Sequence, residues 1–167
     1  MMRYGIARGC AAITLGVAIT LCVAAAVPAA AQDRHAGYYY PIPATIETYK
    51  ARTIVMPDAD RETRIGFIIG ITQKMLSRPY PPRVAMFAKG SEAQKLIIVA
   101  LEDDYLDTLY RARAFFAMLT SVARTTPFIQ DLGLADFLTF FDFVKLLGFE
   151  KITITDGDQF AHQVLLE

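Results

Sequence analysis

Hydrophobic and polar positions follow two kinds of pattern beyond residue 43. Short runs rich in β-branched and aromatic residues, bounded by proline, glycine or charged residues, predict strands. Apolar residues that recur every three to four positions predict helices, because that spacing places them on one face. The predicted strands are 46–55, 83–90, 95–102, 150–154 and 159–167, and the predicted helices are 58–77, 103–125 and 134–147.

The order of the predicted elements, β-α-β-β-α-α-β-β, indicates an α+β fold. The segments 83–90 and 95–102 are expected to form one β-hairpin, and 150–154 and 159–167 a second. We therefore expect residues 44–167 to fold as a single α+β domain with an antiparallel or mixed sheet of about five strands. The three helices are expected to pack mainly on one face of that sheet.

The helix predicted over 103–125 has the clearest amphipathic pattern. Asp103 and Asp104 are expected at its N-terminus, where carboxylates face the positive end of the helix dipole. Asp107 and Arg111 stand four residues apart and are expected to pair on the exposed side. Asp103, Asp104 and Asp107 are also candidates for a metal site, but calcium or magnesium needs several converging oxygen ligands and this spacing matches no metal-binding loop. No metal and no cofactor is therefore predicted.

Phenylalanines surround the helix predicted over 134–147 instead of lying on one narrow stripe. A helix that is hydrophobic all round is usually buried, but a small domain does not readily surround a helix completely. Two interpretations stay open: the helix lies wholly in the core, or it also contacts another molecule. Phe137, Phe140 and Phe141 are the candidate interface residues.

The segment TDGDQFAH joins the last two predicted strands. A two-residue loop would place the apolar residues of the two strands on opposite faces, whereas a three-residue loop over 155–157 brings them to one face. This register places Gly157 in a left-handed conformation. It also points His162 toward the apolar face, opposite Glu150.

His162 and Asp158 are the candidates for chemistry in this segment. A buried structural histidine is one interpretation. The alternative is a general base of a small cofactor-independent hydrolase, with Asp156 or Asp158 nearby. The chain contains no GxSxG nucleophile elbow, and a triad assembled from distant residues cannot be recognised in one sequence.

The first 31 residues have the pattern of a secretory signal peptide. Arg3 and Arg8 form a positive head without acids, and an apolar run follows from about Cys10 to Ala31. Small residues at the end of that run are typical of a signal-peptidase site, so cleavage is predicted after Ala31. The chain is then periplasmic or secreted and keeps no stable membrane anchor. The alternative is an uncleaved anchor, because the run is long enough to span a bilayer.

Residues 32–43 are expected to form a mobile arm ahead of the domain. The segment QDRHAGYYYPIP contains two prolines, which favour an extended conformation over a helix. Either its tyrosines lie on the domain or the arm docks on a partner, because tyrosine is enriched in interfaces. Tyr38, Tyr39 and Tyr40 are the candidate contact residues.

Charge and cysteine content exclude several classes of function. Lysine and arginine number 17, as do aspartate and glutamate. No basic cluster stands out, so no nucleic-acid partner is expected. Both cysteines, Cys10 and Cys22, lie in the predicted signal peptide. The exported chain is therefore expected to contain no disulfide, no thiolate nucleophile and no cysteine metal ligand.

The motifs RIGFIIG, RPYPPR, FAKG, KLIIVALED, LDTLYRARA and DGDQFAH together resemble a family of small exported bacterial proteins whose activity is not established. Some of its members carry the automatic name molybdopterin-guanine dinucleotide biosynthesis protein A. That name implies a cytoplasmic enzyme that uses GTP and magnesium and begins with a glycine-rich LAGGxSxRMGxDK-type loop. This sequence contains no such loop, so a GTP-dependent nucleotidyltransferase is not predicted.

The features together predict an exported, non-catalytic binding or protein-interaction module. The expected partner is another protein or a second copy of the chain. The alternative function is the hydrolase that uses His162.

Overall fold

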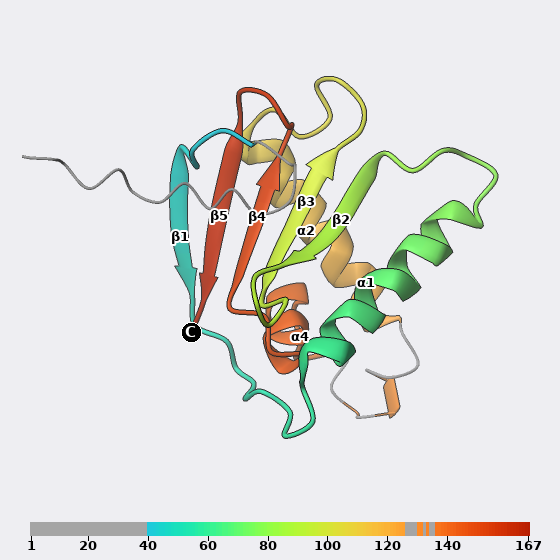
Figure 1. Ribbon diagram of the computed structural model, residues 1–167, viewed down its shortest axis with the longest axis vertical. Helices are drawn as coiled ribbons and strands as arrows, with labels where there is room; N and C mark the ends of the chain where they lie inside the picture. Colours follow the sequence, from blue (N-terminus) through green and yellow to red (C-terminus); the bar gives the residue numbers. More distant parts are fainter. Residues whose placement is uncertain (1–39, 126–129, 132, 134–135) are drawn as a thin grey trace, which may run out of the picture. The chain divides into compact units, whose positions relative to one another are not determined.

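The computed structural model describes residues 40–125, 130–131, 133 and 136–167, all of which belong to one compact unit spanning residues 34–167 (Figure 1). The predicted signal peptide with its cleavage site, Tyr38 and Tyr39 lie outside the described residues. Tyr40 is described and is partly buried. No helix in the described part of the chain is long and apolar enough to cross a membrane.

Five strands form one mixed sheet in the described part of the chain, in the order β1-β5-β4-β3-β2. The hairpin partners β2 and β3 are antiparallel, as are β4 and β5. The two hairpins lie side by side because β3 pairs in parallel with β4, and β1 adds to the edge in parallel with β5. The strands are β1 Thr45–Tyr49, β2 Val84–Lys89, β3 Lys95–Ala100, β4 Lys151–Thr155 and β5 Ala161–Leu166.

The helices α1 (Arg61–Leu76), α2 (Leu109–Arg124) and α4 (Phe140–Leu146) pack against one face of this sheet. Side chains from all three helices and from alternate positions of the strands form one hydrophobic cluster. The ring centroids of Phe67 on α1 and Phe143 on α4 lie 5.4 Å apart. The predicted α+β fold is therefore confirmed, and of the two kinds of sheet that were expected, antiparallel or mixed, the sheet is mixed.

All three helices begin later than predicted. Asp60 caps α1, which begins at Arg61 instead of residue 58, and threonines cap the other two. The side chain of Thr108 accepts a hydrogen bond from the Arg111 N–H, so α2 begins at Leu109. Asp103 and Asp104 therefore lie in the preceding loop, and the prediction that they form the helix N-terminus was wrong. Asp107 does pair with Arg111, at 3.0 Å. Likewise, Thr139 caps α4, which begins at Phe140 instead of residue 134.

The register of the last hairpin differs from the prediction by four residues. His162 lies opposite Ile154, not opposite Glu150. The loop is longer than expected because the side chain of Asp156 accepts three backbone N–H groups of the loop, at 2.9–3.0 Å. A shift of four residues preserves the face of every side chain. The predicted placement of His162 on the apolar face is therefore confirmed, as is the positive φ of Gly157.

Candidate functional site

The start of α4 organises the helical layer. Thr139 and Asp142 form a capping box, in which the Asp142 N–H donates to the Thr139 hydroxyl and the Thr139 N–H donates to the Asp142 carboxylate. This arrangement fixes where α4 begins and how its first turn is oriented relative to the preceding chain. The two phenylalanines that follow the cap, Phe140 and Phe141, consequently face different cavities.

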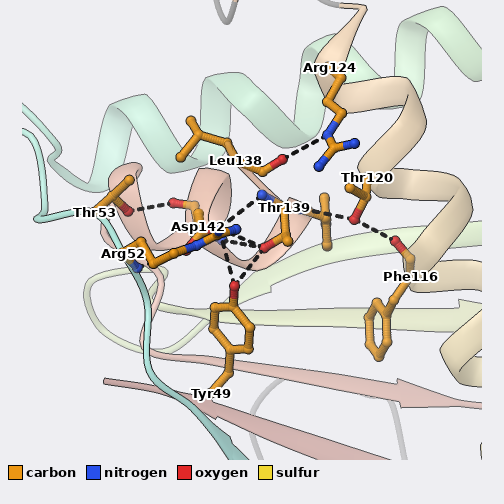
Figure 2. Close-up of polar contacts among 10 residues, drawn as sticks. Tyr49, Arg52, Thr53, Phe116, Thr120, Arg124, Leu138, Thr139 and Asp142 are labelled. Atoms are coloured by element: carbon orange, nitrogen blue, oxygen red, sulfur yellow. Dashed lines mark hydrogen bonds and ion pairs between the residues drawn. The ribbon is translucent and has the colours of Figure 1, made fainter. Parts of the chain in front are cut away.

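Asp142 also joins α4 to the segment that follows β1 (Figure 2). Its carboxylate accepts hydrogen bonds from the Arg52 N–H and guanidinium, both at 2.8 Å, and from the Tyr49 hydroxyl at 3.2 Å. The Thr53 hydroxyl donates to the Asp142 carbonyl at 2.9 Å. The strand predicted over 46–55 ends at Tyr49. The Ala51 N–H still donates to the Glu167 carbonyl just beyond β5, but from Arg52 onward the chain bonds to α4.

The carboxylate of Asp142 is fully buried and still ionised at neutral pH. Burial by itself raises the pKa of this group, but the hydrogen bonds from Arg52 and Thr139 outweigh burial and lower the pKa to about 2. Its oxygens are already occupied by protein donors. We therefore assign Asp142 a structural role and not a role in ligand binding.

A second set of hydrogen bonds fixes α4 against α2 (Figure 2). The Thr120 hydroxyl donates to the Phe116 carbonyl at 3.0 Å and accepts from the Phe140 N–H at 3.1 Å. The Arg124 side chain donates to the Leu138 carbonyl at 3.0 Å. These contacts hold the wall that separates the two cavities described next.

The first cavity, here called the apolar groove, lies between α1 and α2 with α4 as its floor. Its volume is about 440 Å³. Phe140 and Phe143 line it, and Lys74 is the single residue with a charged side chain among its lining residues. The residues that line the groove are Met56, Thr63, Phe67, Gly70, Ile71, Lys74, Leu119, Val122, Ala123, Phe140, Phe143 and Leu147.

The second cavity, here called the His162 pocket, lies between α2, α4 and the sheet edge formed by β1 and β5. Its volume is about 310 Å³. Phe141 sits on one side, with its ring centroid 4.8 Å from that of Tyr49 and 4.9 Å from that of Phe116. The residues that line the pocket are Glu47, Tyr49, Arg113, Phe116, Ala117, Thr120, Thr139, Phe141, His162 and Val164.

His162 is 1% exposed, and its polar neighbours come from β1. Its Nδ1 lies 2.7 Å from the Thr45 hydroxyl, and its Nε2 lies 3.8 Å from a carboxylate oxygen of Glu47. Glu47 in turn forms an ion pair with Arg113 of α2. Burial lowers the pKa of His162, and the Glu47 carboxylate and Thr45 offset part of that effect.

The acids proposed as partners of His162 lie elsewhere. Asp158 is exposed, and its N–H donates to the side chain of Asp156, which serves to close the hairpin loop. The polar neighbours of His162 in the described chain are Thr45 and Glu47 instead. The sequence did not point to Glu47, because it reaches His162 only through the pairing of β1 with β5.

The acidic residues before α2 lie beside arginines. Asp103 and Asp104 line an open cavity of about 530 Å³ together with Arg83 and Arg111. In the part of the chain that the structure describes, no group of three His, Cys, Asp or Glu side chains is arranged to hold a metal ion.

The candidate interface residues have different environments. Phe140 is buried in the core, Phe141 is partly buried in the His162 pocket, and Phe137 is 67% exposed. Tyr40 is partly buried. The capping box could have been found from the sequence, because TFFD matches the pattern of a hydroxyl residue followed three positions later by an acid.

Comparison with known proteins adds no family to these observations. No family model matches the chain, no curated protein matches it, and no solved structure matches it.

Proposed function

We propose that this chain is an exported, non-catalytic binding module that accepts apolar side chains of a protein partner in the groove between α1 and α2. The observation that carries the proposal is the groove itself, which is lined almost entirely by apolar side chains. The N-terminal pattern supports export.

The shape and composition of the groove favour a helical segment of the partner. Two helices form its walls, and grooves of this kind accept the apolar face of an amphipathic helix through anchors spaced three to four residues apart. Phe67, which is partly buried, offers aromatic surface of the kind enriched in interfaces, and the buried rings of Phe140 and Phe143 lie in the floor of the groove. Gly70 in the wall leaves room for close approach, because a Cβ added there would meet no atom within 4 Å.

Two substitutions on α2 test this proposal. Val122 lines the groove and is 41% exposed, whereas Met118 lies on the same helix, is 45% exposed and does not line the groove. We expect Val122→Glu to abolish partner binding, because it places a carboxylate in an otherwise apolar contact surface, and Lys74, the single charged lining residue, is replaced in the assay described next. Met118→Glu is the matched control and is expected to leave binding intact.

Partner binding is measured with a photo-crosslinking residue introduced in place of Lys74, at the exposed rim of the groove. A discrete adduct that disappears in the Val122→Glu protein but persists in the Met118→Glu protein supports the proposal. An adduct with the mass of two copies identifies a homo-oligomer. Absence of any adduct, or equal loss in both variants, contradicts the proposal.

Export is tested separately. The exported product is expected to have the mass of a chain beginning at Gln32, which mass spectrometry determines directly. Recovery of the intact chain in the membrane fraction would instead support an uncleaved anchor.

The alternative of a hydrolase that uses His162 has less support. The hydroxyl in contact with His162 belongs to Thr45, which does not line the pocket. The three hydroxyl groups that line it donate elsewhere, Thr120 to the Phe116 carbonyl, and Tyr49 and Thr139 to the Asp142 carboxylate. In the described residues, therefore, no hydroxyl group both lines the pocket and lies in contact with His162, as a side-chain nucleophile paired with this base would.

A further inference from the structure

One ring nitrogen of His162 is open to the pocket. The Thr45 hydroxyl contacts Nδ1, whereas a carboxylate oxygen of Glu47 lies 3.8 Å from Nε2. This distance exceeds that of a hydrogen bond. No fully buried side-chain nitrogen or oxygen in the described residues lacks a hydrogen-bond partner. Nε2 therefore keeps contact with the space of the pocket, although the side chain as a whole is 1% exposed.

The surroundings of the ring decide which nitrogen carries the proton. Burial lowers the pKa of His162, so the imidazole is neutral near pH 7 and holds one N–H. The Glu47 carboxylate lies on the Nε2 side and favours the proton there. In that tautomer the Thr45 hydroxyl donates to Nδ1, and His162 presents a hydrogen-bond donor to the pocket.

The walls and the mouth of the pocket limit what it accepts. Tyr49, Phe116 and Phe141 are aromatic and suit a flat apolar body. At the mouth, Glu47 and Arg113 form an ion pair, so their charges cancel. An anion would lie close to the Glu47 carboxylate, and its charge would not be balanced by an arginine that is already paired.

We propose that the His162 pocket binds a small, flat, uncharged aromatic molecule whose carbonyl oxygen accepts a hydrogen bond from Nε2–H of His162. The site is separate from the apolar groove, because α4 and the Thr120 contacts lie between them. Its occupancy does not depend on the protein partner proposed for the groove.

Three probes of similar size test the proposal on the purified chain. Benzamide has the ring and the carbonyl, toluene lacks the acceptor, and benzoate carries a charge. We expect benzamide to produce a saturable shift of the Nε2 resonance in a spectrum of the ¹⁵N-labelled imidazole. Toluene is expected to bind about fivefold more weakly, the ratio that one neutral hydrogen bond contributes. Absence of a shift up to the solubility limit of benzamide overturns the proposal, as does equal or tighter binding of benzoate.

Two pairs of variants separate binding from folding. His162→Gln keeps an N–H donor near the position of Nε2, whereas His162→Asn keeps a polar group only near Nδ1. Binding of benzamide, measured by calorimetry, is expected to persist in the Gln variant and to fall about fivefold further in the Asn variant.

A second pair leaves His162 unchanged. Ala117→Phe fills the pocket from the exposed side of α2, and Ala114→Phe on the same helix lies outside it. Loss of benzamide binding in the Ala117 variant alone supports the site. Binding that persists in the Ala117 variant, or that both variants lose equally, overturns it.

Discussion

The apolar groove and the His162 pocket share two helices but differ in chemistry. Phe140 and Phe141 are consecutive, yet the first lines the groove and the second lines the pocket. The groove has one charged lining residue, at its rim, so contact area and shape govern what binds there. The pocket is a small space bordered by the imidazole of His162, with one ring nitrogen open to it, and by the ion pair of Glu47 and Arg113. The short helix α4 thus separates the apolar groove from the His162 pocket, which offers a polar ring nitrogen for a hydrogen bond.

The largest expected effect comes from truncating the two consecutive phenylalanines. Phe140 is buried in the core, so Phe140→Ala is expected to lower the free energy of unfolding by about 3–4 kcal/mol. Phe141 is only partly buried, and Phe141→Ala is expected to cost about 1–2 kcal/mol. Chemical denaturation of both variants measures the difference.

The same pair tests whether the two cavities are independent. Phe141→Ala is expected to weaken benzamide binding while leaving the crosslink at the groove intact. Equal costs in stability for the two substitutions would contradict the assignment of Phe140 to the core and Phe141 to the pocket.

The contribution of Asp142 to the free energy of unfolding is expected to fall in acid. The pKa of Asp142 is about 2 in the folded chain, whereas an aspartate without these contacts has a pKa of 3.8, so the unfolded state binds a proton first as pH falls. The stabilisation is therefore complete above about pH 4 and is lost as pH falls through about 2. Its size is about 2 kcal/mol, because one pKa unit corresponds to about 1.4 kcal/mol.

Asp142→Asn isolates this contribution. The difference in unfolding free energy between wild type and variant is expected to shrink between pH 4 and pH 2, as denaturant titrations at each pH will measure. Other carboxylates such as Asp60, whose pKa is also lowered, titrate in both proteins and cancel in the difference. Asp158→Asn, at an exposed loop position, is the control for the replacement of an aspartate by asparagine.

The smallest expected effect concerns His162. Burial lowers its pKa, so below about pH 6.5 the unfolded state binds a proton more readily than the folded state. Wild-type stability is expected to fall as pH drops from 6.5 toward the lowered pKa, and His162→Gln is expected to lack that component. The Glu47 carboxylate opposes the shift and Arg113 adds to it. A wild-type protein that gains stability over this range relative to the variant would contradict a buried neutral imidazole.

Local patterns predicted the elements well where the spacing of side chains alone decides them. The alternation in 150–154 and 159–167 placed His162 on the apolar face even though the predicted register was four residues off. A shift by an even number of residues leaves every side chain on the same face of the sheet. Helix starts were less accurate, since Thr108 and Thr139 cap the helices in place of the acids and apolar residues before them. The TFFD capping box at Thr139 was recognisable from the sequence.

Sequence periodicity indicated which segments form strands and helices, because periods of two and of about 3.6 residues fix which side chains share a face. The order of these segments predicted the α+β fold with helices mainly on one face of the sheet. The folded chain, in contrast, decided which polar groups meet. Thr45 and His162 are separated by 117 positions and Arg52 and Asp142 by 90. Both contacts depend on how distant segments pack together, which the spacing of side chains within one segment does not reveal. Because β1 pairs with β5 and α4 packs on α2, two cavities form where the sequence shows only a phenylalanine-rich helix and one histidine.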